Sequence, residues 1–297
     1  MRIAAAVLAG LVVLPSSVSA WGFEAHKFIA DRMIALLPAE LRPLFEKRRA
    51  FVVERAIDPD LWRTVGWEQE PPNHFLDIDH EAFGPFPFNE LPRDYSAAVQ
   101  KFGKEFIDTQ GLLPWRTAEF YGRLQREFES LERTDPPGYA LDNIVLYSAV
   151  IAHYVADGHV PLHSAVNYDG QLTDQRGIHS RWEAELFERN RQKLTIAPPA
   201  IPPVSNPRDF LFDALLSGSK DVPNVLASDK AAAQGREFYD DAYFEALAKG
   251  TLPTLERRLN VAIAAVAAVI TGAWEQAGRP PVPAEFPRTR RPIRRPK

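Results

Sequence analysis

The chain contains no cysteine, which excludes disulfides, thiolate metal sites and cysteine nucleophiles together. It also lacks the Gly-x-Ser-x-Gly elbow on which many serine hydrolases depend. Its formal net charge of −4 shows no basic excess of the kind that nucleic-acid-binding domains carry. Any metal ion must therefore be held by histidine, aspartate, glutamate or main-chain groups, and an acidic chain suits divalent cations.

Apolar runs long enough to cross a bilayer are also missing. Residues 3–14 and 261–270 are the apolar runs, and a membrane span needs about 20 residues. The first run follows Arg2 and precedes small residues up to Ala20, a pattern that is typical of a cleaved secretory signal. We expect residues 1–20 to be a signal peptide, Trp21 to start a secreted or periplasmic protein, and an uncleaved anchor to be the alternative.

Residues 280–297 differ in composition from the rest of the chain. They are rich in proline and arginine, and the last ten residues contain six basic side chains and no acidic one. We predict a disordered tail there, and a single domain over residues 21–279. The basic tail favours contact with polyanions in general, and no stable protein partner is predicted.

Helical periodicity dominates the remainder, and few segments alternate with period two, so the predicted fold is all-α. The segment 141–155 is apolar on nearly all sides and should form a central, buried helix. Residues 197–207 contain five prolines and must be a loop. The other helices are expected at residues 28–37, 95–107, 114–131, 181–194, 209–216, 240–249 and 254–277.

Five of the seven histidines fall into a pattern with carboxylates. His153 and Asp157 are four residues apart on the predicted central helix, so both side chains leave from one face. His179 and Glu183 repeat this spacing. A single buried histidine is usually a satisfied core residue, but several buried imidazoles and carboxylates are costly unless they are paired or bind a metal. The joint pattern indicates zinc on nitrogen and oxygen ligands.

The five short motifs also carry a resemblance. In this order, the chain resembles the trinuclear-zinc nucleases of the S-one/P-one type and their superfamily relative, the bacterial zinc-dependent phospholipase C, whose fold packs helices around the zinc cluster. The motifs are Trp21-x4-His26, Asp60-x2-Arg63, His74-Phe75-x-Asp77, His153-x3-Asp157-x3-Pro161-x-His163 and His179-x3-Glu183.

The resemblance implies ligands for three zinc ions. Asp157 would bridge two of them, and Asp58 is a rival to Asp60. The first ion would be held by Asp60, His74, His153 and Asp157; the second by His163, His179 and Glu183; the third by the amino nitrogen and carbonyl oxygen of Trp21 with His26 and Asp157.

The implied chemistry is cleavage of a phosphate ester by a zinc-bound hydroxide, because a water that bridges two zinc ions loses its proton near neutral pH. Arg63 would contact the phosphoryl group. Phe75 would stack on a base, unless it packs in the core. Asp77 would hydrogen-bond that base, unless it supports His74. His159 is expected beside the ligands, and His80 in a solvated loop.

Three functions are compatible with these motifs. The first is a nuclease or nucleotidase that acts on single-stranded nucleic acid or nucleotides, which the short spacing from Trp21 to His26 and Arg63 favour. The second is a phospholipase C, which Glu183 in place of an aspartate and the short gap between His163 and His179 favour. The third is an exported zinc-binding protein without turnover.

Overall fold

The computed structural model describes residues 22–286, which form helices joined by loops, with no β-strand among them. The predicted all-α fold class is thereby confirmed. The predicted signal peptide, Trp21 and residues 287–297 lie outside the described residues.

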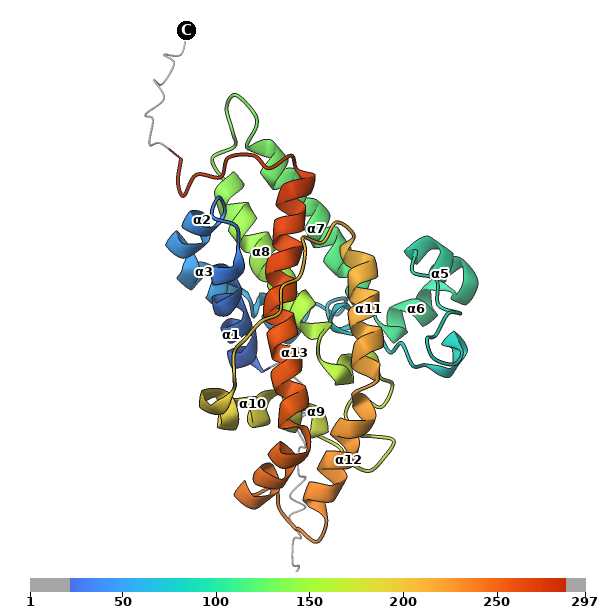
Figure 1. The fold of residues 1–297 in the computed structure, drawn as a ribbon. Helices are drawn as coiled ribbons and strands as arrows, with labels where there is room; N and C mark the ends of the chain where they lie inside the picture. The colour runs from blue at the N-terminus through green and yellow to red at the C-terminus, as the bar shows by residue number, and fades with distance from the viewer. Residues whose placement is uncertain (1–21, 287–297) are drawn as a thin grey trace, which may run out of the picture.

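The core is built around α8 (Ala140–Asp157), the helix expected to be central. It packs against α7 (Leu113–Ser130), α1 (Phe23–Met33), α3 (Arg49–Arg55) and α13 (Asp241–Gln276) (Figure 1). Every residue from 148 to 160 is buried. The second half of α8, which carries His153 and Asp157, is therefore enclosed by other helices on all sides.

The longest helix is α13, for which we predicted two helices separated at Pro253. The helix continues through this proline. Buried side chains before and after it, such as Leu247, Thr251 and Leu255, pack on the same body, and this packing outweighs one missing backbone hydrogen bond. By length and composition α13 could cross a membrane, but 78% of its most apolar window is buried, as expected for a core helix.

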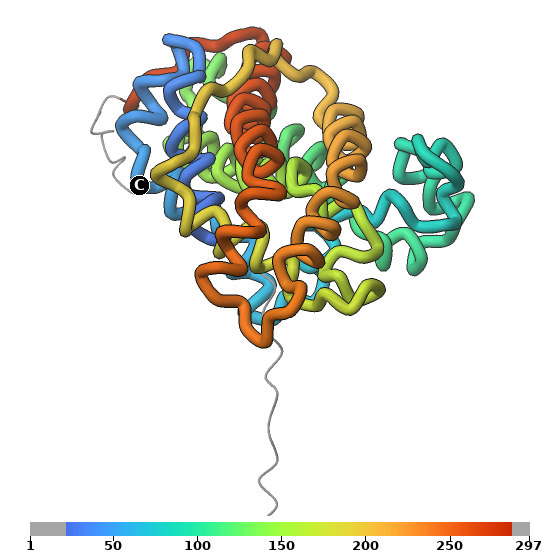
Figure 2. Tube along the Cα trace, turned by 60° about the horizontal axis from the view of Figure 1, so that its bottom comes forward, coloured from blue at the N-terminus to red at the C-terminus, as the bar shows by residue number. Residues whose placement is uncertain are grey.

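Two further helical regions differ from the prediction. Residues 95–107 form two helices, α5 (Tyr95–Phe102) and α6 (Lys104–Gln110), because Gly103 adopts a φ of 88° that ends the first. This pair lies in a lobe that projects from the body in Figures 1 and 2. The helix α12 (Val222–Ala233), which was not predicted, packs on α13 after α11 (Pro207–Ser219).

The proline-rich segment is a loop over residues 197–206, as expected, and Pro207 begins α11; the loop crosses α13 closely. The Val204 amide donates to the Ala268 carbonyl at 3.0 Å, and a Cβ at Gly272 would come within 1.9 Å of the Val204 oxygen. The absence of a side chain at Gly272 permits this crossing. The loop is thus an internal connection, packed between α13 and the Tyr121 hydroxyl of α7.

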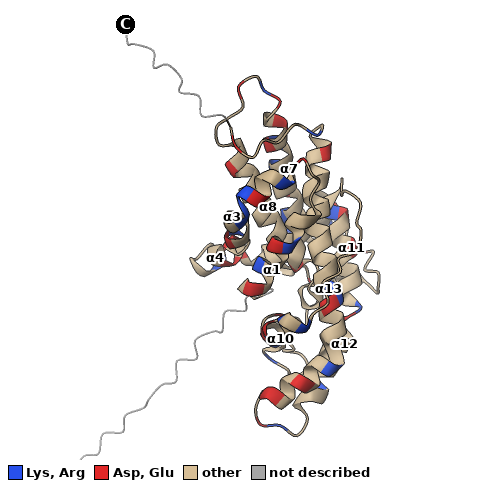
Figure 3. Cartoon of the chain, turned by 60° about the vertical axis from the view of Figure 1, so that its left-hand side comes forward, with Lys and Arg blue, Asp and Glu red and all other residues tan. Residues whose placement is uncertain are grey.

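Residues 280–286, the first part of the predicted tail, contact the helical body. The Trp274 indole donates to the Pro280 carbonyl at 2.9 Å, Val282 is buried, and Lys47 pairs with Glu285. These contacts extend the packed body past residue 279, because an indole donor and an apolar surface are available there. In the view of Figure 3, basic and acidic residues are interspersed along the outer helices.

Candidate metal centre

Eight predicted ligands lie within the described residues, and all eight are buried. They come from seven helical elements. His26 lies on α1, Asp60 on α4 (Asp58–Thr64), His74 on η2 (Pro71–His74), His153 and Asp157 on α8, His163 on η4 (Pro161–Ser164), His179 on α9 (Ile178–Ser180), and Glu183 on the π-helix η5 (Arg181–Glu185). We call these eight residues the cluster.

Asp157 is at the centre of the cluster. Its Oδ2 lies 3.1 Å from His74 Nδ1 and 3.3 Å from His153 Nε2, and its Oδ1 lies 3.3 Å from His26 Nε2. The i,i+4 spacing on α8 places Asp157 beside His153, as the sequence predicted. The tertiary fold brings the other two imidazoles to the same carboxylate.

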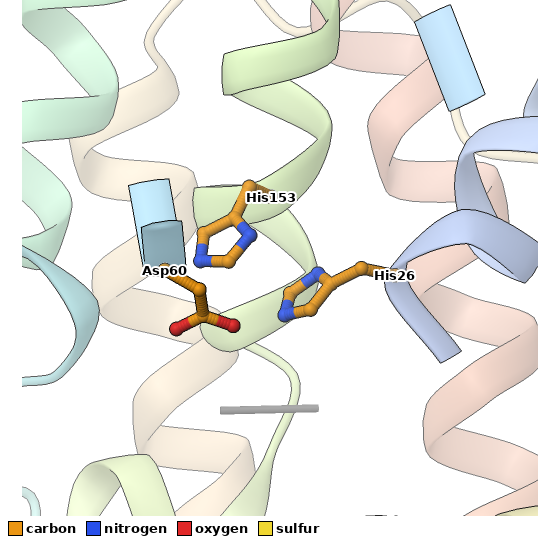
Figure 4. A group of neighbouring side chains, drawn as sticks. All are labelled: His26, Asp60 and His153. Atoms are coloured by element: carbon orange, nitrogen blue, oxygen red, sulfur yellow. The ribbon is translucent and has the colours of Figure 1, made fainter. Parts of the chain in front are cut away.

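The possible ligand atoms converge in three groups, each with its atoms within 4.8 Å of one another. Figure 4 shows the first group, in which side chains from α1, α4 and α8 point toward one another. Buried groups of this composition can hold metal ions. The groups are His26, Asp60 and His153; His74, His153 and Asp157; and His163, His179 and Glu183.

Backbone carbonyls orient two of the imidazoles. His153 Nδ1 lies 2.8 Å from the Ala56 carbonyl oxygen, and His163 Nδ1 lies 2.6 Å from that of His74. A carbonyl can only accept, so each Nδ1 carries the proton and donates it. In the neutral form, each ring then has its Nε2 lone pair directed into the cluster, the arrangement found for histidines that bind metals.

Most buried polar atoms without a hydrogen-bond partner in the described part of the chain belong to the cluster. Among the other described residues, only the side-chain atoms Asp77 Oδ1 and Ser148 Oγ are in this state. The contact of His179 Nε2 with Glu183 Oε2, at 3.0 Å, is close but lacks hydrogen-bond geometry. Burying a polar atom without a partner costs about 1–3 kcal/mol of stability. A concentration of such atoms therefore indicates a site that binds a partner from outside the chain. They are His26 Nδ1 and Nε2, His74 Nε2, Asp157 Oδ1, His163 Nε2, His179 Nδ1 and Nε2, and both Glu183 oxygens.

The pKa values of the cluster residues are shifted in different directions. Burial lowers the pKa of His179 to about 4 and raises the pKa of Glu183 to about 8. Burial alone would lower the pKa of His74, but the hydrogen bond to Asp157 and the nearby Glu70 carboxylate raise it to about 9. Burial would raise the pKa of Asp157, but the neighbouring His153 and His163 hold it well below its usual range. Binding of a cation would therefore displace protons from His74 and Glu183.

The choice between Asp58 and Asp60 follows from their positions on α4. Asp60 is fully buried and belongs to the group with His26 and His153. Asp58 pairs with Arg55 instead, at 3.4 Å, and belongs to none of the three groups. Asp60 is therefore the candidate ligand, and Arg63 Nη2 contacts its Oδ1 at 3.1 Å.

A pocket of about 200 Å³ opens beside the cluster. Arg63 and Phe75, both predicted to bind substrate, contribute to its wall, whereas Asp77 does not. Asp77 is half-buried elsewhere, and burial with the nearby Asp79 charge raises its pKa to about 8. The pocket is lined by Arg63, Pro71, His74, Phe75, Leu162, His163, Tyr168 and His179.

Two residues of the site were not predicted. Tyr168 lines the pocket and lies edge-on to His179, and no motif marks it. Glu70 Oε1 lies 3.6 Å from His74 Nε2, and Glu70 also accepts from Asn73 and the Tyr154 hydroxyl. Its position four residues before His74 is the signal that could have found it.

The remaining two histidines lie apart from the three groups. His159 donates from Nδ1 to the Val155 carbonyl at 2.7 Å and packs near Phe210. His80 accepts from the Ala82 amide at 3.1 Å and caps a short helix, so it has a structural role in its loop.

A scan against protein-family models and a search of curated proteins found no match to this chain.

Proposed function

We propose that the protein is a zinc-dependent phosphoric ester hydrolase, with single-stranded nucleic acid or nucleotides as substrate. The observation that carries this proposal is the convergence of imidazole and carboxylate atoms in three buried groups, several of which also contain atoms without a hydrogen-bond partner. Imidazole and carboxylate donors without cysteine suit zinc, and the donor set fits the ligands that the resemblance implies.

The cluster residues would hold the ions in the arrangement implied by the sequence. Asp60, His74, His153 and Asp157 would hold one ion, and His163, His179 and Glu183 a second. His26 and Asp157 would contribute to a third, together with Trp21. Gly22, the first described residue, supports this assignment, because a Cβ there would come within 2.6 Å of Ala184, next to Glu183. The start of the described chain thus reaches the cluster.

Zinc in such a site lowers the pKa of a bound water toward neutrality and neutralises charge on phosphoryl oxygens. The protein's own residues would bind and orient the substrate. Arg63 lies at the pocket with its guanidinium anchored on Asp60, so it can donate to a phosphoryl oxygen from a fixed position. Phe75 and Tyr168 offer aromatic surfaces for a base in the same pocket.

A phospholipase C is the second candidate, and exposed apolar side chains favour it. Val65, just after Arg63, is 74% exposed, and Leu172, in the loop that carries Tyr168, is 68% exposed. Exposed apolar side chains that follow pocket residues in the chain suit a lipid surface. The small, partly aromatic pocket favours a base, and for this reason nucleic acid is the first choice.

The decisive experiment compares two substrates on the same zinc-loaded, exported protein. We expect hydrolysis of single-stranded DNA and little or no release of the headgroup from phosphatidylcholine vesicles. Turnover of the lipid alone would replace the first candidate with the second. Zinc binding without turnover of either substrate would leave an exported zinc-binding protein.

A second experiment tests the role of Trp21. A chain with one extra residue before Trp21 would move the amino group away from the cluster. We expect it to bind one fewer zinc ion than the protein that begins at Trp21, as measured by metal analysis after gel filtration. An equal zinc content in the two proteins would remove Trp21 from the ligand set.

A further inference from the structure

The segment that carries Glu183 is a π-helix, η5, which lies between the short helix α9 and α10 (Leu186–Asn190). π-Turns are rare, and they persist where surrounding contacts stabilise them. The side chains of this segment point in different directions. His179 and Glu183 enter the cluster, and Trp182 donates to Thr251 on α13 at 3.0 Å. Arg181 binds a different set of partners.

Arg181 is 5% exposed, and its guanidinium bridges three parts of the fold. It donates to Asp229 Oδ1 on α12 at 2.9 Å and to the Tyr243 hydroxyl on α13 at 2.9 Å. It also donates to the carbonyls of Gln175 at 3.1 Å and Arg176 at 2.8 Å, in the loop that leads into α9. A buried guanidinium with this many partners fixes the rotation of the backbone that carries it.

The backbone just before His179 is fixed from both sides. Gly177 has a φ of 84°, and a Cβ there would come within 2.8 Å of Arg181 Nη1. On the other side, Asp169 Oδ1 accepts from the amides of Gly177, at 2.9 Å, and His179, at 3.3 Å. The loop, the guanidinium and the start of α9 therefore form one connected unit.

We propose that Arg181 is a positioning residue that sets the direction of the His179 and Glu183 side chains into the third ligand group. The proposal rests on the proposed function, because that group is a zinc site only if the cluster binds zinc. Both side chains lie within two residues of Arg181, at a π-turn that interrupts the α-helical hydrogen bonding of residues 178–190. Without the Asp229 and Tyr243 contacts, this segment can relax to an α-helical register that turns Glu183 away from His163.

The test compares Arg181→Met with a matched control, Arg258→Met. Arg258, on α13, is 3% exposed and also pairs with a carboxylate, Asp221, at 2.6 Å, but its other partner is Ser217 on α11, and none of its ion pairs or hydrogen bonds is to a cluster residue. Both variants lose a buried ion pair, and only Arg181→Met loses contacts next to the ligands. We expect Arg181→Met to bind one zinc ion at least tenfold more weakly than wild type, with the other ions retained, and Arg258→Met to bind all ions normally.

Cobalt(II) substitution gives a readout that loss of stability alone would not change. We expect the visible absorption of one cobalt site to change in Arg181→Met and to stay unchanged in Arg258→Met. Arg181→Lys should restore part of the affinity, because lysine can reach Asp229 but cannot bridge all the partners. If Arg181→Met fails to fold, Tyr243→Phe, which removes the hydroxyl that accepts from Arg181 and donates to Asp229, should weaken binding of the same ion by a smaller factor.

Several outcomes would overturn the inference. If Arg181→Met had the zinc affinity and the cobalt spectrum of wild type, the inference would be wrong. It would also be wrong if Arg258→Met lost as much zinc affinity as Arg181→Met. A wild-type protein that binds no zinc would overturn the proposed function and the inference with it. Zinc binding without hydrolysis would overturn the proposed activity only, because the affinity and cobalt measurements would still test the role of Arg181.

Discussion

Two buried polar regions lie on either side of the same short helical segment, and they differ in one respect. In the cluster, imidazoles and carboxylates approach one another closely, yet many of their atoms have no hydrogen-bond partner. In the region around Arg181 and Asp229, every buried side-chain nitrogen and oxygen atom has a partner within the described chain. Both regions contain charged groups taken out of water, so burial alone does not explain the difference.

The difference indicates what each region needs from outside the chain. A fully hydrogen-bonded network is complete, and removing one partner from it leaves a buried charge exposed to the low-dielectric interior. A cluster with unpartnered atoms is incomplete until an ion or substrate binds. We therefore expect variants of the cluster to affect metal content and activity first, and variants of the Arg181 region to affect stability even without metal.

The largest effect is expected for Asp157→Asn, at the centre of the cluster. The variant should lose at least one zinc ion and reduce hydrolysis about 10³-fold, because one carboxylate contacts three imidazoles. Metal analysis and a phosphodiester assay measure both effects. The control is Asp142→Asn, on the exposed face of the same helix. Full activity in Asp157→Asn would remove the bridging role.

Asp229→Asn tests the hydrogen-bonded region around Arg181 and Asp229. The substitution leaves the Arg181 guanidinium buried without its counter-ion, which should destabilise the metal-free protein by about 3–5 kcal/mol. Urea unfolding in the presence of a chelator measures this. Asp213→Asn, which removes an exposed partner of Arg93, should cost less than about 1 kcal/mol. Equal stability losses in the two variants would show that the complete network contributes no more than a surface ion pair.

Arg63→Ala tests the edge of the cluster. We expect turnover to fall about 100-fold, because a fixed donor to the phosphoryl group is lost, while the zinc content stays the same. Arg63→Lys should recover part of the rate, since the charge is retained without the bidentate geometry. Loss of zinc from Arg63→Ala would mean instead that Arg63 holds Asp60 in place.

The smallest effect is expected at Asp77, whose unpartnered Oδ1 lies in neither region. Burial and the Asp79 charge raise its folded-state pKa to about 8, from an ordinary value of 3.8. Its contribution to stability is therefore present below pH 3.8 and is lost as the pH rises through 8. Asp77→Asn does not undergo this loss. The melting temperature of the variant minus that of wild type should therefore increase by a few degrees as the pH rises from 5 to 9. Parallel melting curves over this range would contradict the assignment.

The sequence determined the elements whose physics is local. The apolar periodicity of residues 141–155 predicted the central helix α8, and the i,i+4 spacings paired His153 with Asp157 and His179 with Glu183. The residue types also restricted any metal site to nitrogen and oxygen donors. Proline and glycine also act on the backbone locally. At Pro253, however, packing of the buried side chains along α13 outweighs the helix-breaking effect of proline, and the helix continues.

Only the tertiary structure decided which distant segments meet. Helix packing brings His26, Asp60 and His74 to Asp157, and it selects Asp60 over Asp58 because only one of them faces the cluster. It also leaves several atoms of the cluster without a hydrogen-bond partner, whereas the buried polar atoms around Arg181 all have one. Spacing along one helix is fixed by hydrogen bonds a few residues apart, whereas these outcomes depend on how separate buried surfaces fit together. For this reason Arg181, which matches no motif, became visible only in the fold.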